Sequence, residues 1–171
     1  MQISDMNEKD SIDVLKRVHL GRLACAQYDQ PYVTPIFFAC NDSSLYSFTT
    51  IGQRLNWMRA NPLVCLEVDD VTDAQNWLSV IVFGRFAELP DTPHFTAERE
   101  LAYELLRRRP IWWEPAYVKT TVNAVERPLE LTYFRIRIDK ITGRRSIPDA
   151  TLRPVFRDRI SRWLGHALRG G

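Results

Sequence analysis

The turns between the first apolar segments are too short to connect anything but antiparallel strands. Three segments of strand-like composition occupy residues 21–28, 32–40 and 45–50, and only short runs of turn-forming residues lie between them. A parallel pair needs a crossover of about a dozen residues or more, usually a helix. The chain therefore begins as an antiparallel meander, which argues against a doubly wound α/β sheet.

Three more strands and three helices are expected around this meander. Apolar runs and period-two alternation predict strands at 63–68, 76–89 and 128–143, and helical spacing predicts helices at 4–18, 52–61 and 92–109. The third helix has Thr92 as its expected N-cap, Pro93 at its first position, and Leu101 among the residues facing the body. Six mostly antiparallel strands with peripheral helices predict a mainly β fold, a small closed or partly split barrel.

Three residues mark irregular points in the predicted strands. Pro35 cannot donate a ladder hydrogen bond, so its strand should lie at an edge, a bulge or an opening of the sheet. Gly84, in the middle of the fifth strand, indicates a bulge or a close approach of another segment. The apolar alternation changes phase near Tyr133, which predicts a bulge there.

Length and composition place the chain among ordinary globular proteins. Its 171 residues, 45% hydrophobic and 26% charged, predict a single domain spanning residues 1–171. No apolar run approaches the roughly 20 residues of a membrane span, and the acidic N-terminus is unlike a signal peptide, so we expect a cytoplasmic protein with no membrane segment. Cys25, Cys40 and Cys65 have no CxxC spacing and are expected to be buried thiols, without a metal.

Arginines concentrate near the C-terminus, although the net charge is only +2. Residues 144–171 hold seven arginines and two aspartates. Apolar residues recur at helical spacing in this segment, which predicts an amphipathic helix at about 151–169, with the arginines on its solvated face. A helix docked on the body or on a partner subunit is therefore favoured over an arm that binds nucleic acid.

A polar corner follows the third strand. Thr49 and Thr50 end the strand, Gly52 permits a turn, and Arg54 begins the next helix. Free backbone N–H groups at a helix start, hydroxyls and a guanidinium are the donors that bind a phosphate. The alternative is an ordinary capped helix with a surface arginine.

The segment QPYVTPIFFACNDSSLYSFTTIGQRLNWMRANPLVCLEVDD, followed by WLSVIVFGRFAEL, extends this corner into a longer pattern. Together with an earlier GRLA, it contains P-x-x-x-P, G-x-R before a helix, Asn-Pro, and S-V-x-V-x-G. This combination resembles the FMN-binding split barrel of the pyridoxamine 5'-phosphate oxidase family, and most closely its smaller flavoprotein and nitroimidazole-resistance branch. The resemblance covers roughly residues 8–90 and implies a six-stranded antiparallel split β-barrel.

The resemblance also implies a cofactor, its binding residues and a partner. In the family, FMN binds at the interface of a homodimer, and both chains hold each flavin. The matching positions here fall into three groups: Val33, Thr34, Pro35 and Ile36 beside the flavin ring and ribityl chain; Thr49, Thr50, Gly52, Gln53 and Arg54 at the phosphate; and Trp77, Ser79 and Val80 on the fifth strand, where the family places a polar side chain near the flavin.

Three positions depart from the family pattern. The oxidases follow the corner arginine with a lysine, and Leu55 stands here. They hold the substrate phosphate with a lysine where this chain has Ala39, and they end in a W-R-L-x-P stretch that is absent. In the nitroimidazole-resistance branch a histidine often precedes the threonine-like pair, and Phe48 occupies that position. Pyridoxamine phosphate is therefore not the expected substrate, and no catalytic residue can be carried over.

The other polar residues do not suggest a catalytic set. His19, His94 and His166 are scattered, and Asp69-Asp70 is interpreted as a solvated turn. A flavin itself performs hydride and electron transfer, so the protein needs only to bind, orient and tune it. The sequence therefore predicts an FMN-dependent oxidoreductase that acts on a small molecule, with a reduced nicotinamide as electron donor.

Two questions stay open. Trp112, Trp113 and Tyr117 lie in an irregular aromatic segment that could cover a flavin or substrate, or could equally anchor a loop or a dimer contact. The alternatives to a flavin enzyme are a related barrel that binds or degrades haem, and a non-enzymatic module that only binds flavin. A haem protein would need an axial ligand such as His, Cys or Tyr.

Overall fold

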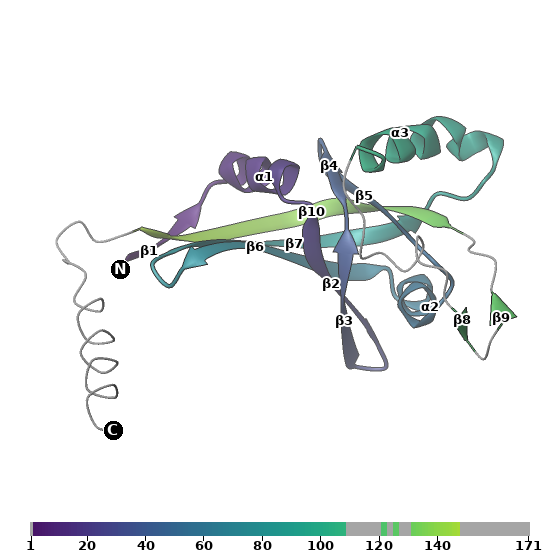
Figure 1. The fold of residues 1–171 in the computed structure, drawn as a ribbon, viewed down its shortest axis with the longest axis horizontal. Helices are drawn as coiled ribbons and strands as arrows, with labels where there is room; N and C mark the ends of the chain where they lie inside the picture. The colour runs from purple at the N-terminus through teal and green to yellow at the C-terminus, as the bar shows by residue number, and fades with distance from the viewer. Residues whose placement is uncertain (1, 109–120, 123–124, 127–130, 148–171) are drawn as a thin grey trace, which may run out of the picture.

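The structure is a computed structural model that describes residues 2–108, 121–122, 125–126 and 131–147 (Figure 1). Three sequence predictions fall outside these residues: the helix at 151–169, the aromatic set Trp112, Trp113 and Tyr117, and His166. In the part of the chain that is described, no helix is long and apolar enough to cross a membrane.

The described elements follow in this order: β1 (Gln2–Met6), α1 (Glu8–Arg17), β2 (Leu20–Gln27), β3 (Gln30–Phe37), β4 (Ala39–Asn41), β5 (Ser44–Thr49), α2 (Gln53–Ala60), β6 (Leu63–Asp73), β7 (Asn76–Glu88), a 3₁₀ turn (Pro93–Phe95), α3 (Thr96–Leu106), β8 (Thr121–Val122), β9 (Val125–Glu126) and β10 (Thr132–Ile147). The helices and strands expected within the described residues are therefore present. β8 and β9 form a separate two-stranded sheet.

The main sheet is antiparallel and curls into a barrel. Its strand order is β3-β2-β6-β7-β10-β5-β4, and β1 pairs with the end of β10. Because only Phe38 separates β3 from β4, these two strands are halves of one extended segment, which pairs with β2 through its first half and with β5 through its second half. The predicted six-stranded antiparallel split barrel is confirmed, and β1 is an addition to it.

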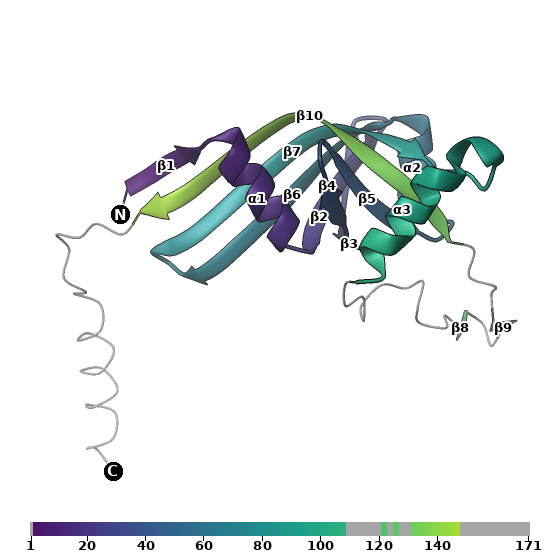
Figure 2. The ribbon, with the colours of Figure 1, turned by 90° about the horizontal axis from the view of Figure 1, so that it is seen from above.

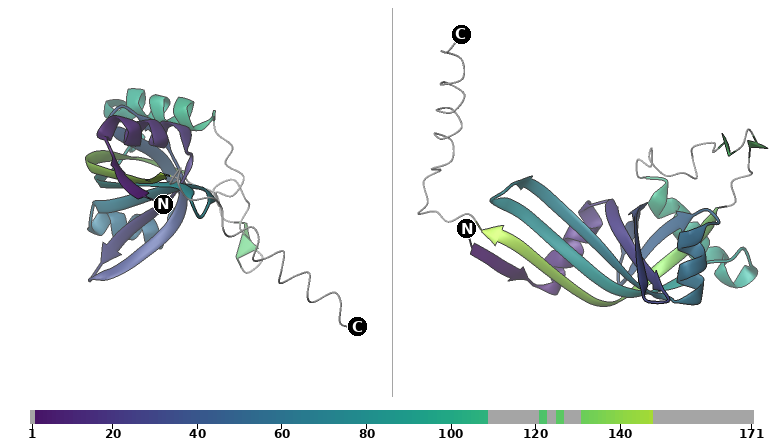
Figure 3. Two further views of the ribbon diagram at one scale, coloured as in Figure 1. Left: turned by 90° about the vertical axis from the view of Figure 1, so that its left-hand side faces the viewer. Right: turned by 90° about the horizontal axis from the view of Figure 1, so that it is seen from below.

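The barrel is open along the first half of β3. The Ser47 hydroxyl of β5 donates to the Phe37 carbonyl of β3 at 2.5 Å, but β3 and β5 form no ladder with each other. The chain after β5 forms α2, which packs against β2 (Figure 1). The strong curvature of the sheet is clear in Figure 3. The corner that follows β5 therefore lies at the split of the barrel.

The barrel interior is filled by the apolar face of each strand and by the helices. The α1 helix is capped by Asn7, whose side chain accepts from the Asp10 N–H at 2.7 Å, and it buries Val14 and Leu15. The fully buried side chains of the main core include Leu23, Ile36, Phe38, Leu45, Leu55, Met58, Leu66, Val68, Val80, Val82, Phe134 and Ile136. Cys25 also belongs to this core, and burial raises the pKa of its thiol. The expectation of unpaired, largely buried cysteines is confirmed, although Cys65 is half-buried.

The α3 helix differs in detail from the prediction. A 3₁₀ turn comes first, and the Thr92 side chain makes no capping hydrogen bond; instead the Thr92 carbonyl accepts from Phe95 N–H at 3.0 Å. Leu101 is 37% exposed, whereas Ala102 and Leu106 are buried. The predicted inward position of Leu101 is therefore wrong, because the helix packs on the barrel through Ala102 and Leu106, which lie one turn apart and contact the clusters around Tyr46 and Phe48.

A charged contact fixes α3 on the barrel. The Tyr46 hydroxyl donates to Glu98 Oε1 at 3.3 Å, and Arg135 Nη1 donates to the same oxygen at 2.8 Å. Burial, followed by the nearby Glu98 carboxylate, raises the pKa of Tyr46. Figure 2 shows α3 lying over β5 and β10, while β6, β7 and β10 extend past the barrel toward β1.

The irregular positions are only partly as predicted. Pro35 lies on β3, which pairs with β2 on one side, so its edge position is confirmed. A Cβ at Gly84 would lie 2.5 Å from the Arg137 carbonyl oxygen, so the close approach is confirmed as well. The bulge, however, lies between Ile138 and Lys140, opposite Gly84, and not near Tyr133.

The reason for this error lies in what covers β10. Around Tyr133 the strand pairs regularly with β5. Phe134 faces the barrel interior, whereas Leu131 and Tyr133 pack beside Leu106 of α3 on the other face. Both faces of the strand are apolar there. In the sequence, this gives the same pattern as a bulge that shifts the apolar alternation from one face to the other.

Candidate functional site

The predicted corner forms one wall of a pocket at the split of the barrel. Its volume is about 300 Å³, and the residues around it are Tyr32, Thr34, Pro35, Thr49, Thr50, Gly52, Gln53 and Arg54. Seven of these eight residues belong to the set named from the sequence. They come from β3, from the end of β5 and from the start of α2, so the pocket joins the two edges of the opening.

Arg54 spans the opening. Its Nη1 donates to Thr34 Oγ1 at 3.1 Å and to the Pro35 carbonyl at 3.2 Å, both on β3, and its Nη2 donates to Thr49 Oγ1 on β5 at 2.7 Å. These three hydrogen bonds fix the orientation of the guanidinium across the opening. Its positive charge also acts on the core side, where it partly opposes the rise in the pKa of Cys25 that burial causes. The arginine is therefore a preoriented cation in a wall of hydroxyls.

The start of α2 adds backbone donors to this wall. The first N–H groups of a helix have no partner within the helix, and the helix dipole places partial positive charge there. Gly52 precedes the helix, makes no side-chain cap, and has open space where a Cβ would lie, while the first turn of α2 holds no acidic residue. The Gly52 backbone is extended, with φ 177°, a conformation that other residues also adopt. What glycine provides is open access to the helix start.

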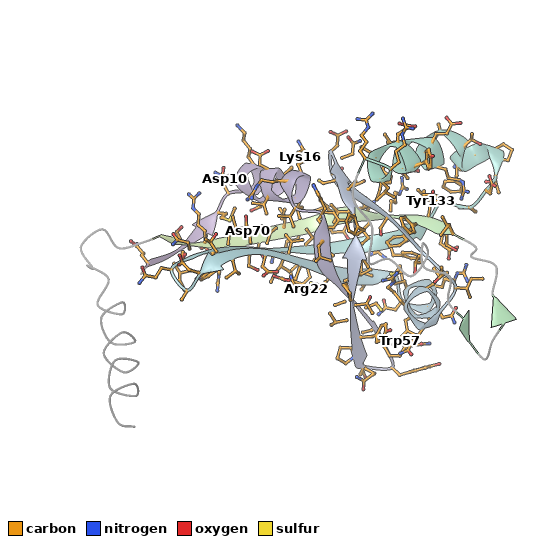
Figure 4. All side chains as sticks on the ribbon, viewed as in Figure 1. Asp10, Lys16, Arg22, Trp57, Asp70 and Tyr133 are labelled. Atoms are coloured by element: carbon orange, nitrogen blue, oxygen red, sulfur yellow. The ribbon has the colours of Figure 1, made fainter. Side chains whose placement is uncertain are left out.

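Tyr32 is a pocket residue that the sequence reasoning missed. Its ring centroid lies 5.4 Å from that of Trp57, with an angle of 60° between the rings. Trp57 follows Arg54 by one helical turn, and Figure 4 labels it beside α2 and β3. The signal was present in the sequence, because Tyr32, Thr34 and Ile36 alternate along one strand and therefore share a face.

The four residues predicted beside the flavin ring do not act together. Thr34 faces the pocket and Pro35 offers it a carbonyl, but the Ile36 side chain is fully buried in the barrel core. Val33 points to the other face of the sheet, where it is 58% exposed. Alternation along a strand makes this division unavoidable for consecutive residues.

The fifth-strand residues are also separated from the corner within one chain. Trp77 and Ser79 line a different hollow of about 610 Å³, formed by β7, β10 and the end of β1. The Ser79 hydroxyl donates to Glu67 Oε1 at 3.0 Å. Val80 is fully buried in the core and can offer a ligand no side chain. The structure therefore brings the phosphate set together but places Trp77 and Ser79 elsewhere.

The outer face of the sheet carries exposed apolar side chains. One row across the strands consists of Val33, Ala24, Cys65 and Phe83, which are paired in register. Val33 is 58% and Phe83 46% exposed, and Leu63 nearby on β6 is 55% exposed. Contiguous exposed apolar surface of this kind is typical of a contact with another protein. We call the row of Val33, Ala24, Cys65 and Phe83 the outer apolar row.

Charged pairs surround the second half of β6. Arg22, on the outer face, contacts both Glu67 and Asp69, and Arg17 of α1 donates from Nη1 to Asp70 Oδ2 at 2.6 Å; Figure 4 labels Arg22 and Asp70. The prediction that Asp69 and Asp70 form a turn is wrong, because β6 continues to Asp73. Their ion pairs with arginines of other elements are enough to explain both carboxylates as structural residues. Among the described residues, no group of His, Cys, Asp and Glu could hold a metal ion.

Comparison with known proteins agrees with this architecture. The sequence profile of the family described as pyridoxamine 5'-phosphate oxidase matches residues 7–145. The chain belongs to this family. An uncharacterized protein from Rhizobium meliloti is 37% identical over 144 residues, which cover 84% of this chain and 95% of that protein.

Two solved structures in the family's neighbourhood share the fold. A FAD-binding protein from Mesorhizobium loti is 34% identical and superposes with a TM-score of 0.72, covering 86% of this chain and 99% of the other. A Bacteroides thetaiotaomicron protein, described as a candidate for 5-nitroimidazole antibiotic resistance, is 14% identical, with a TM-score of 0.59 and coverage of 84% and 89%. At that identity the second comparison shows the fold alone.

Three positions at which the sequence departs from the pattern of the pyridoxamine 5'-phosphate oxidase family can be placed in the structure. Leu55 is fully buried in the barrel core, so this position does not face the pocket at all. Ala39 and Phe48 are buried together against Leu106 of α3. Helix α3 therefore covers the region where the sequence comparison placed a substrate-binding lysine and a histidine, which agrees with the expectation that neither residue's role transfers to this chain.

Proposed function

We propose that this protein is a flavoprotein that binds a flavin nucleotide through its phosphate at Arg54. The observation that carries the proposal is the guanidinium held across the barrel opening by uncharged acceptors, at the wall of a pocket. FMN is the cofactor expected from the sequence, and FAD carries the same ribityl phosphate. The related Mesorhizobium loti protein is named as FAD-binding, which supports a flavin.

The donor set fits a phosphate group. The hydroxyls of Thr49 and Thr50, the N–H groups at the start of α2 and the guanidinium of Arg54 all lie around one pocket. A guanidinium can donate two parallel hydrogen bonds to phosphate oxygens, and charge-assisted bonds of this kind are about twice as strong as neutral ones. The hydrogen bonds that Arg54 now makes to Thr34 and Thr49 would keep its orientation before a ligand arrives.

We further propose that the protein acts as a homodimer. Within one chain the phosphate corner and the hollow at Trp77 and Ser79 share no residue, so one chain alone does not surround a flavin with both groups. A second copy packed on the outer apolar row would cover exposed Val33 and Phe83 and could place its own Ser79 near the corner. The polar contact of Ser79 with Glu67 would then lie within a contact between two chains.

The proposed reaction is a flavin-dependent oxidation or reduction of a small molecule, with a reduced nicotinamide as electron donor. A bound flavin would supply the hydride and electron transfer itself. The chain's own contribution is to hold the phosphate at Arg54, to position the rest of the cofactor along Thr34 and Pro35, and to limit the access of water. No catalytic acid or base is needed for this proposal.

The proposal is tested by the visible absorption spectrum of the purified protein. We expect flavin bands, and after denaturation we expect release of a free flavin nucleotide in an amount close to one per chain, identified by chromatography. A Soret band would instead support the haem alternative. Colourless protein that takes up no flavin from solution would overturn the proposal. Flavin release without any nicotinamide-dependent reduction would support a binding module without enzymatic activity.

A further inference from the structure

A groove lies beside α1, where the pairing of β10 has a gap. β5 pairs with residues 132–137 of β10 and β1 pairs with residues 143–147, so the stretch between them has β7 on one side and no described strand on the other. A hollow of about 470 Å³ lies at this gap, and Ile12, Ile138 and Ile141 form its apolar lining. These side chains pack against the barrel core but are only partly buried. We call this hollow the α1 groove.

The α1 groove has an acidic rim. Glu8 of α1, Asp42 of the turn before β5 and Asp139 of β10 line it, and Lys140 is the only basic residue among its described lining residues. Asp139 accepts hydrogen bonds from Arg137, and Glu8 and Asp42 are exposed. The rim stays net negative even when Arg137 is counted. An apolar lining inside such a rim suits a segment that brings apolar side chains together with positive charge.

We propose that residues 151–169 dock in the α1 groove of their own chain, as the amphipathic helix that the sequence predicts. The sequence from 148 to 171 holds five arginines and two aspartates, a net charge of +3, which leaves −1 for the rest of a chain whose net charge is +2. Leu152, Phe156 and Ile160 share the apolar face of the predicted helix. The apolar side chains would enter the groove, and the arginines would face its acidic rim. The proposal does not depend on flavin binding.

The segment begins close enough to reach the α1 groove. β10 ends at Ile147, and Ile141 of the groove lies six residues back along the same strand, about 20 Å away. Phe156 follows Ile147 by nine residues. Five extended residues span about 17 Å, and one helical turn adds about 5 Å. A segment that turns back beside β1 therefore brings Phe156 level with Ile141.

β1 and the C-terminal segment both lie outside the family match, and they are neighbours. The family profile covers residues 7–145, so it includes neither β1 nor the segment after Ile147. β1 and the end of β10 pair directly, with Gln2 opposite Ile147. The α1 groove begins where β1 leads into α1, at Glu8. A docked C-terminal segment would therefore be an addition to the barrel that belongs with β1.

The larger hollow at Trp77 and Ser79 also lies near the end of β10, but its charge does not select this segment. Asp5 and Arg144 line that hollow together and form an ion pair at 3.5 Å, so these two side chains add no net charge. In the proposed dimer, Ser79 would lie in the contact with a second copy. The acidic rim therefore favours the α1 groove.

The test is photo-crosslinking of the full chain with benzoyl-phenylalanine in place of Phe156. We expect a crosslink within one chain, which leaves the mass on a denaturing gel unchanged. Peptide mass spectrometry should place this crosslink in the α1 groove, at residues 8–12, 42–43 or 138–141. The matched control carries the same group in place of Ser161, which lies on the opposite face of the predicted helix and should give no crosslink to the groove.

Two sets of variants test the same contact in a different way. Phe156→Asp should speed hydrogen exchange of the groove amides by about tenfold, because a charge replaces a buried aromatic side chain, whereas Ser161→Asp adds the same charge on the solvated face and should leave exchange unchanged. The double variant Glu8→Gln, Asp42→Asn should lower the crosslink yield by about two- to fivefold. Asparagine keeps the turn, because it tolerates the positive φ of 51° that Asp42 adopts.

Three other outcomes would overturn the proposal. A crosslinked species of twice the mass would show that the segment docks on a second copy. A crosslink at Trp77 or Ser79 would place the segment in the other hollow. No crosslink, together with equal exchange in the wild-type protein and Phe156→Asp, would show that the segment does not dock. None of these results bears on the flavin proposal, which the absorption spectrum tests separately.

Discussion

Replacing Arg54 with alanine should weaken flavin-nucleotide binding by about ten- to a hundredfold, which corresponds to about 1.5–3 kcal/mol. The reason is the loss of a charge-assisted contact to the phosphate, made by a side chain that Thr34 and Thr49 already hold in place. The test is a fluorescence titration of flavin-free wild-type protein and flavin-free Arg54→Ala with the flavin nucleotide, which gives the two dissociation constants to be compared. An unchanged dissociation constant would contradict the assignment of Arg54 to the phosphate.

A matched control for this experiment lies on the same helix. Arg59 is also on α2, but its guanidinium pairs with Glu88 of β7, away from the pocket, with Nη2 donating to Glu88 Oε2 at 2.9 Å. Arg59→Ala removes the same charge from the protein and should leave the flavin affinity within about twofold, since exposed ion pairs contribute little. Because Arg54 also bridges β3 and β5, thermal unfolding of both flavin-free variants should be recorded beside the titrations.

Replacing Phe134 with alanine should have the largest effect on stability. Phe134 is fully buried on β10, between β5 and β7, and its ring lies 5.4 Å from that of Phe86. Truncation of such a side chain removes buried apolar surface and leaves a cavity, which typically costs about 3–5 kcal/mol. A single domain is usually stable by only about 5–15 kcal/mol, so the loss is a large share of the total. Denaturant unfolding of the flavin-free protein measures it.

The comparison for Phe134 is an aromatic residue on the protein surface. Tyr103 lies on α3 and is 52% exposed, so Tyr103→Ala should change the free energy of unfolding by less than about 1 kcal/mol. A cost for Phe134→Ala below about 1 kcal/mol, with wild-type circular dichroism, would show that β10 does not form the centre of the barrel core. That result would contradict the topology described above.

The fold was predictable where its signals are local. Short turns between alternating strands identified the antiparallel meander, and residues 49–54 are close in sequence, so their convergence at one corner needed no knowledge of tertiary structure. Pro35 and Gly84 carry their structural constraint in the residue type itself. These elements follow from steric and hydrogen-bonding rules that act within a few residues.

The errors arise where a second layer covers a strand or where distant segments meet. Helix α3 covers the outer side of β10 near Tyr133, so apolar residues occur on both faces and the bulge was expected in the wrong place. Tyr32 was missed although it shares a strand face with Thr34, because its contact with Trp57 joins β3 to α2, which are distant in sequence. Ser79 was expected near the flavin, and within one chain it lines a hollow separate from the corner.

The central claim is that the corner at Arg54 binds the phosphate of a flavin, and a comparison of FMN with riboflavin tests it most directly. The two ligands differ by the phosphate alone, so the ratio of their dissociation constants isolates that group. The account predicts that wild-type protein binds FMN at least about tenfold more tightly than riboflavin, and that this ratio falls toward one in Arg54→Ala. Equal affinities of the wild-type protein for FMN and riboflavin would contradict the claim.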